Sequence, residues 1–125
     1  MITGISSPDV PAPAGTYSLG VVSHGFLFIA GQGPFDSEGA LVGETFADQL
    51  RQTFRNLEAV AAAAGTSLAN TVRLGVYLRS LDDFAELNEL AKEFLTQPYP
   101  ARTTIRAELS GFLIEVDAIV ALPEA

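Results

Sequence analysis

The sequence contains no cysteine and a single histidine, His24. A chain without cysteine forms no disulfide and offers neither a thiolate nucleophile nor a thiolate ligand for a metal. Zinc sites are built mainly from cysteine and histidine ligands, so no metal site of this kind is expected. The lack of cysteine is compatible with a reducing compartment.

Basic residues are also scarce. The sequence has 7 lysines and arginines and 15 acidic residues, which give a formal net charge of −8. Nucleic acids and anionic membranes both require a concentrated positive surface, which this composition disfavours. The sequence shows no apolar stretch long enough to cross a bilayer, and its first residues lack the basic and apolar regions of a secretory signal. We therefore expect a cytoplasmic protein that binds neither nucleic acid nor a membrane.

The 125 residues are enough for one domain with a buried core, which we place at residues 1–125. Three prolines within residues 1–15 predict an extended N-terminal arm. Strands are predicted at residues 17–23, 26–32, 71–79, 101–109 and 113–121, with helices from an N-cap at Thr45 to Gly65 and from an N-cap at Ser80 to Pro98. Two amphipathic helices on one side of a sheet are typical of an α+β sandwich.

Two short turns determine the expected strand pairing. His24-Gly25 predicts a hairpin between the first two strands, and Ser110-Gly111 predicts another between the last two. The second hairpin would pair Arg106 with Glu115 and Thr104 with Asp117, with Arg102 further along the same face.

The hydrophobic pattern also predicts which side chains face the core. They include Val72, Leu74, Val76 and Leu78 in the middle strand, Leu81, Phe84, Leu87, Ala91, Phe94 and Leu95 in the second helix, and Ile114, Val116, Ala118 and Val120 in the last strand. The segment Phe26–Ala30 is apolar on both faces. Burying one large apolar side chain stabilises a fold by roughly 1.5–3 kcal/mol. We therefore expect a partner subunit to cover the second face, with clefts between subunits.

One arginine and one acid stand out as candidate site residues. Arg102 opens a predicted strand, and Glu115 lies inside the next one. A guanidinium offers donors matched to a carboxylate, and a glutamate can accept a proton from an attacking water. Structural interpretations remain open, because Arg102 could pair with an acid on its own sheet face and Glu115 with Arg106.

Three segments of the chain resemble the Rid family, the reactive intermediate/imine deaminases, which are also called the YjgF family. They are Pro100–Thr104 (Pro-Ala-Arg-Thr-Thr), Ile114–Ala118 (Ile-Glu-Val-Asp-Ala) and Gly31–Pro34 (Gly-Gln-Gly-Pro). Further matches are Gly15-Thr16-Tyr17, Gln49, Asn56-Leu57-Glu58, Ala64-Gly65, Asp83-Phe84 and Asn88, so the resemblance covers nearly the whole chain. It implies a homotrimer of a chorismate-mutase-like α+β fold, with two helices on one face of a mixed six-stranded sheet and active sites between subunits.

The resemblance also implies a chemistry. Rid proteins hydrolyse 2-imino acids such as 2-iminopropanoate and 2-iminobutanoate, or their 2-enamine tautomers, to 2-oxo acids and ammonia without a cofactor or a metal. Arg102 matches the family arginine that binds the substrate carboxylate, and Glu115 matches the glutamate associated with the attacking water. The substrate-pocket residues of the family match Tyr17, Gly31 and Asn88.

Two positions depart from the family pattern. Thr104 stands where the family often has cysteine or serine, so a hydroxyl survives, and we expect it to contact the substrate in an altered pocket. Ala30 stands where serine is common, which removes one hydrogen bond. Tyr17 also has a structural interpretation as a packing aromatic residue, and Asn88 as a partner of a backbone group.

Two other functions compete with deamination. A trimeric protein could bind 2-oxo acids in the same cleft for a regulatory purpose, without turnover. Ribonuclease activity, reported for some relatives, is disfavoured by the acidic composition and by the lack of a histidine pair for acid–base cleavage.

Overall fold

The computed structural model describes residues 1–124, which form one six-stranded sheet and two α-helices. The strands are β1 (Thr3–Ile5), β2 (Gly20–Ser23), β3 (Phe26–Gln32), β4 (Thr71–Leu78), β5 (Ala101–Arg106) and β6 (Ile114–Ala121). The helices are α1 (Phe46–Ala63) and α2 (Phe84–Leu90), and the short 3₁₀ turns are η1 (Leu68–Asn70), η2 (Leu81–Asp83) and η3 (Ala91–Glu93).

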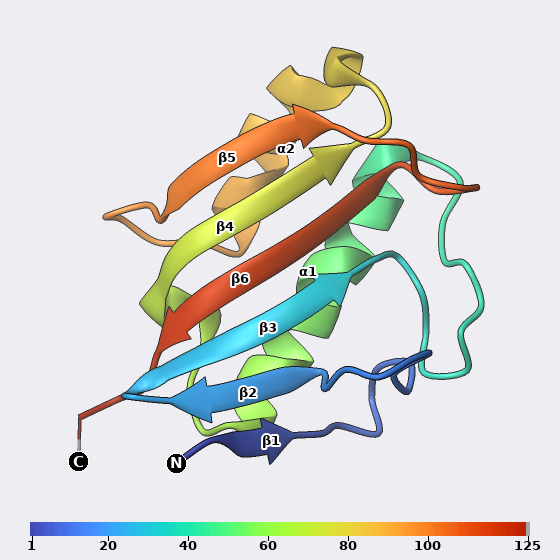
Figure 1. Ribbon diagram of the computed structural model, residues 1–125. Helices are drawn as coiled ribbons and strands as arrows, with labels where there is room; N and C mark the ends of the chain where they lie inside the picture. Colours follow the sequence, from blue (N-terminus) through green and yellow to red (C-terminus); the bar gives the residue numbers. More distant parts are fainter. Residues whose placement is uncertain (125) are drawn as a thin grey trace.

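The sheet has the order β1-β2-β3-β6-β4-β5, in which only β4 and β5 run parallel. Both helices lie behind the sheet in Figure 1, and no described element covers its front. We call the covered side the helix face and the other side the open face. The predicted α+β class, with two helices on one face of a mixed six-stranded sheet, is confirmed.

Helix α1 forms where the sequence predicts it. Thr45 caps its N-terminus by accepting a hydrogen bond from the backbone N–H of Asp48 at 3.1 Å. Gly65, with φ of +81°, follows its C-terminus in the left-handed conformation that glycine adopts without strain. Its apolar stripe, which includes Leu50, Phe54 and Leu57, is fully buried against the helix face and forms the centre of the core.

The N-terminal half shows one confirmed turn and two differences. His24 and Gly25 both have positive φ, 52° and 80°, and join β2 to β3 as the predicted hairpin. The predicted first strand was too long, since β2 begins at Gly20. The sixth strand comes from within the predicted arm, where Thr3–Ile5 pairs with β2.

The predicted hairpin between the last two strands is wrong. Strand β5 pairs in parallel with β4, and β6 runs between β3 and β4. Arg106 is therefore aligned with Leu78, and Glu115 with Tyr77. The helical crossover through α2 returns the chain parallel to β4, and the polar strand β5 takes the sheet edge while the apolar β6 takes the centre.

Some residues predicted to face the core are exposed. A register shift between Thr71 and Arg73 turns Val72 outward, where 43% of its surface is accessible. The second helix is interrupted, because α2 has only 7 residues and lies between two 3₁₀ turns. The first turn of the predicted helix is therefore 3₁₀ rather than α, and the 3.6-residue spacing does not hold there. As a result Leu81 and Phe84 are exposed, whereas Leu87 and Ala91 are buried as predicted.

The open face carries exposed apolar side chains. In β3, Leu27 and Ile29 are buried on the helix face, whereas Phe26 and Phe28 retain 39% and 44% of their accessible surface. The prediction that β3 is apolar on both faces is thus confirmed. That a partner subunit covers its open face stays a prediction. Within residues 1–124, no helix is both long and apolar enough to cross a membrane.

Candidate active site

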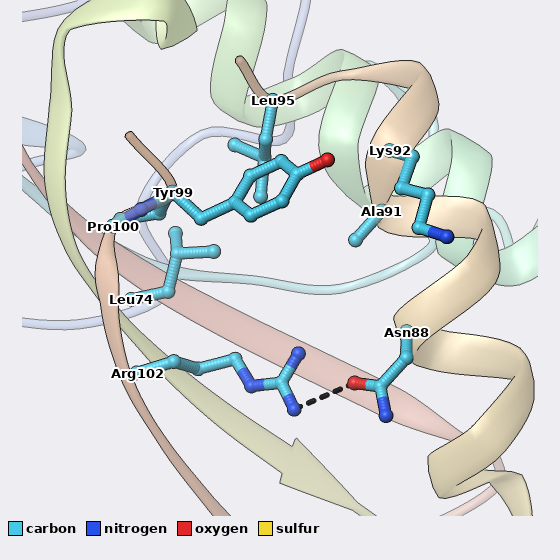
Figure 2. Close-up of a pocket in the computed structure, with 8 residues that line it drawn as sticks. All are labelled: Leu74, Asn88, Ala91, Lys92, Leu95, Tyr99, Pro100 and Arg102. Carbon is cyan, nitrogen blue, oxygen red and sulfur yellow. Dashed lines mark hydrogen bonds between the residues drawn. The ribbon is translucent and has the colours of Figure 1, made fainter. Parts of the chain in front are cut away.

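Arg102 projects from edge strand β5 toward helix α2 on the helix face. Its Nη2 donates a hydrogen bond of 2.7 Å to Oδ1 of Asn88 (Figure 2). Its guanidinium carbon lies 5.4 Å from the centre of the Phe84 ring. Among the described residues, no carboxylate lies within 4 Å of the guanidinium. The interpretation of Arg102 as half of an ion pair on its own sheet face is therefore wrong.

The charge of Arg102 is available to a ligand. Partial burial lowers the pKa of its guanidinium below the ordinary arginine value, but an arginine stays cationic at neutral pH. Asn88 engages one nitrogen of the planar fork through its amide oxygen. The remaining donors suit a bidentate contact with a carboxylate.

Arg102 forms one end of a cavity of about 440 Å³ between β5, α2 and η3 (Figure 2). The polar lining consists of Arg102, Asn88 and Lys92. The apolar lining consists of Leu74, Ala91, Leu95, Tyr99 and Pro100. Lys92 makes an exposed ion pair of 3.2 Å with Glu89, so Arg102 is the lining cation without a carboxylate partner among residues 1–124.

Thr104 lies two residues beyond Arg102 in β5, and therefore on the same face of the strand. Its cross-strand neighbour is Val76, which is fully buried beneath the helices. The Thr104 hydroxyl is itself buried and has no hydrogen-bond partner among residues 1–124. Buried hydroxyls are normally satisfied, so this unpartnered group beside Arg102 is unusual, but it is not among the residues that line the cavity.

Glu115 lies on the opposite face of the sheet. It is aligned with Tyr77 on β4, and its carboxylate occupies the space above Gly31 on β3. A Cβ atom at Gly31 would lie 2.5 Å from Glu115 Oε2, so the carboxylate keeps this position only while residue 31 has no side chain. Burial, and then the negative charge of Asp117, raise the pKa of the Glu115 carboxyl above 4.5.

Asp117 continues this acidic row on the open face. Its Oδ2 accepts a hydrogen bond of 2.8 Å from the Tyr77 hydroxyl, and its Oδ1 lies 3.9 Å from Nη1 of Arg73. The Asp117 contact raises the pKa of Tyr77 above 10.0. Gly75 makes room for this carboxylate, because a Cβ there would lie 2.7 Å from Oδ1.

Two parts of this arrangement were missed from the sequence. Arg73, Gly75 and Tyr77 alternate in the predicted strand on the side away from the core, which was the available signal for the contact with Asp117. Tyr99 immediately precedes the Pro-Ala-Arg motif, but nothing in its spacing indicates that it lines a cavity with Leu95.

The candidate residues thus fall into three groups within one chain. Arg102, Asn88 and Thr104 lie on the helix face, and Glu115 and Gly31 lie on the open face. Tyr17 lies elsewhere, ahead of β2 near the β1 edge, with its hydroxyl accepting a hydrogen bond of 3.1 Å from the Ala14 backbone N–H. The structure therefore does not bring Arg102 and Glu115 together in a single protomer, and the predicted pairing of Glu115 with Arg106 is also wrong.

The helix face presents a cation whose free donors match the acceptors of a carboxylate. A guanidinium oriented by an amide lies at one end of a cavity whose remaining lining is mostly apolar, apart from Lys92 and the Tyr99 hydroxyl. No group of three or more possible metal ligands occurs in the described part of the chain. These features define a small α+β domain suited to binding an organic acid.

Comparison with known proteins places the chain in a family. The family described as Endoribonuclease L-PSP matches residues 7–122, and the chain belongs to this family, which includes the RutC and Rid (YjgF) proteins. The RutC family protein y4sK of Sinorhizobium fredii is 38% identical over 98% of this chain and 99% of the relative. The 2-iminobutanoate/2-iminopropanoate deaminase of Dermatophagoides farinae is 33% identical over 94% of both chains.

Solved structures share the fold. RidA from the Antarctic bacterium Psychrobacter sp. PAMC 21119 is 38% identical, with a TM-score of 0.89 over 96% of this chain and 99% of that chain. E. coli TdcF with bound serine is 29% identical, with a TM-score of 0.87 over 97% of this chain and 99% of that chain. A relative of this fold therefore binds a small molecule that carries a carboxylate.

Proposed function

We propose that this protein is a hydrolase that converts reactive 2-imino acids, or their 2-enamine tautomers, to 2-oxo acids and ammonia. The observation that carries the proposal is Arg102, whose guanidinium is oriented by Asn88 and is free of carboxylates within 4 Å among the described residues. The deaminase from Dermatophagoides farinae supports it, as does the bound serine in TdcF. Expected substrates include 2-iminopropanoate and 2-iminobutanoate.

We propose that the working site forms between subunits of a homotrimer. Within one chain the sheet separates Arg102 from Glu115, so a single protomer cannot place both on one small substrate. A partner whose open face approaches the helix-face cavity would set its own carboxylate opposite the guanidinium. The exposed Phe26 and Phe28 on the open face support such an association, because subunit contact would remove their surfaces from water.

In the proposed reaction, Arg102 binds the substrate carboxylate and the Thr104 hydroxyl contacts the substrate beside it. Glu115 of the partner subunit accepts a proton from water as the water oxygen bonds to the imine carbon. The same proton then moves to the nitrogen and gives a carbinolamine. As the carbon–nitrogen bond breaks, the hydroxyl proton also passes to the nitrogen and the carbonyl forms, so one ammonia leaves for each water consumed. General acid–base assistance of this kind contributes roughly 10²–10⁴-fold, and the raised pKa of Glu115 suits a group that both takes and returns a proton.

A coupled assay tests this function. A serine or threonine dehydratase generates the imine, and release of the 2-oxo acid is followed with and without the purified protein. We expect a faster release with the wild-type protein and loss of the acceleration with Arg102→Ala. A rate equal to that in buffer, or an undiminished rate with Arg102→Ala, would contradict the proposal.

A second function, ligand binding without turnover, is favoured by one specific observation. The carboxylate-binding end of the cavity is complete within one chain, whereas the proton acceptor must come from another. A binding or regulatory protein would need only the first of these. Saturable binding of 2-oxo acids together with no acceleration of imine hydrolysis would establish this alternative.

Ribonuclease activity has weaker support despite the description of the family. The single histidine, His24, lies in the exposed β2–β3 turn, where its Nδ1 is 2.8 Å from the Ser23 hydroxyl. The formal net charge of −8 also opposes binding of a phosphate backbone.

A further inference from the structure

We infer that the apolar part of the cavity beside Arg102 is a subsite for the substrate side chain, and that the protein selects 2-imino acids with large apolar or aromatic side chains. The inference rests on the proposed function, because it assigns the side chain of the same substrate whose carboxylate binds Arg102. It is carried by the shape, the lining and the charge of the cavity.

The inner wall of the cavity is apolar and buried. Leu74 and Ala91 retain only 1% and 6% of their accessible surface, and Leu95 and Pro100 are half-buried. Tyr99, which is 50% exposed, also lines the cavity, and its hydroxyl points toward the segment that carries Lys92 (Figure 2). An apolar group that enters this space loses contact with water on several sides.

The two ends of the cavity differ in charge. Figure 2 shows the Arg102 guanidinium reaching toward Asn88 at one end, with Leu95 and Tyr99 at the other. Lys92, on η3, makes an exposed ion pair of 3.2 Å with Glu89. Among residues 1–124, no acidic residue lines the cavity. A 2-imino acid carries its carboxylate and its side chain on the same carbon, so a carboxylate on Arg102 would direct the side chain along the apolar wall.

The size of the cavity favours a large side chain over a small one. At about 440 Å³, the cavity is far larger than a methyl group requires, so 2-iminopropanoate would leave most of the apolar wall in contact with water. Each methylene transferred from water to an apolar wall strengthens binding by about fourfold. A benzyl or isobutyl side chain should therefore gain at least tenfold over a methyl group.

A substrate series tests the subsite. An amino-acid oxidase generates the imines of alanine, leucine and phenylalanine in turn, and kcat/KM is measured for each. We expect kcat/KM for the leucine and phenylalanine imines to exceed that for the alanine imine by at least tenfold. An equal or reversed order would overturn the inference while leaving the deaminase function in place.

Two variants test the wall itself. Leu95→Trp fills the cavity, and Tyr99→Ala removes one of its walls. Because Tyr99 is exposed, Tyr99→Ala still tests the subsite if Leu95→Trp fails to fold. Each should lower the ratio of kcat/KM for the phenylalanine imine to that for the alanine imine by at least tenfold. Leu41→Trp enlarges an exposed leucine outside the cavity and should leave this ratio unchanged. An unchanged ratio in both cavity variants would refute the subsite.

Calorimetry separates failure of the subsite from failure of the proposed function. Binding of pyruvate and of phenylpyruvate, the corresponding 2-oxo acids, requires no turnover. Tighter binding of phenylpyruvate that Tyr99→Ala weakens supports the subsite even if no imine is hydrolysed. Equal binding of both acids, unaffected by Tyr99→Ala, overturns the subsite whatever the assay of hydrolysis shows.

Discussion

The two faces of the sheet hold opposite halves of the proposed chemistry. The helix face presents a cation, Arg102, at one end of an apolar cavity that a single chain completes. The open face presents two carboxylates, Glu115 and Asp117, above glycines that make room for them. Binding and proton transfer are thus built on different surfaces, and changes on one face should affect one function more than the other.

The largest effect is expected from Glu115→Gln on the open face. The amide cannot accept a proton from water, so kcat should fall by roughly 10²–10⁴-fold. Because Arg102, and not Glu115, binds the substrate carboxylate in the proposed site, the dissociation constant for a 2-oxo acid should change little. Steady-state kinetics and calorimetry measure the two quantities, and an equal loss in both would contradict the separation of the faces.

Arg102→Lys on the helix face should give the converse result. Lysine keeps the charge but loses the planar fork that can bind a carboxylate through two nitrogens. Charged hydrogen bonds are worth roughly 1.5–3 kcal/mol, so 2-oxo acid binding should weaken by about 10- to 150-fold. Arg55→Lys, on α1 and outside the cavity, serves as the matched control. If Arg102→Lys binds 2-oxo acids as tightly as the wild-type protein does, Arg102 does not bind their carboxylate.

Gly31→Ala tests the space that holds Glu115. The new Cβ would displace a carboxylate that lies 2.5 Å from its position, and we expect kcat to fall by about tenfold, because small misplacements of reacting groups are costly. Gly4→Ala is the control, since the nearest atom to its Cβ would be Ser18 Oγ at 3.8 Å. Equal activities of the two variants would show that the position of Glu115 does not matter.

Asp117→Asn should produce the smallest change, a displaced pH profile. Glu115 must be ionised to act as a base, so activity rises as pH increases through its pKa. The charge of Asp117 contributes to the raised pKa of Glu115, after burial, and its removal should move the acidic limb of the kcat/KM profile to lower pH. Asp82→Asn in η2 is the control. A shift toward higher pH would contradict this coupling.

Much of the fold could be predicted from local signals. Thr45 and Gly65 bound α1, and His24-Gly25 marks the β2–β3 turn, because caps and tight turns depend on a few adjacent residues. The buried side of β6 was also predicted, since Ile114 and Val116 alternate with polar residues. These features require no knowledge of which segments meet in space.

The strand neighbours could not be predicted in the same way. Gly111 does adopt a positive φ of 85°, as the turn signal suggested, yet the strands on either side of it pair elsewhere. Which strand lies beside β6 depends on the path of the chain through α2, a long-range property. The candidate site shared this error, because placing Arg102 and Glu115 on one face assumed that β5 and β6 form a hairpin.

The division of Arg102 and Glu115 between two sides of the sheet has a genetic consequence. If each site takes its guanidinium from one chain and its carboxylate from another, two different inactive variants can repair each other. A mixed assembly of Arg102→Ala and Glu115→Gln chains would contain some interfaces in which both intact side chains meet. If the two inactive variants regain activity when they are refolded together, the sites must be shared between chains. If each site lies within one chain, the mixture would remain inactive.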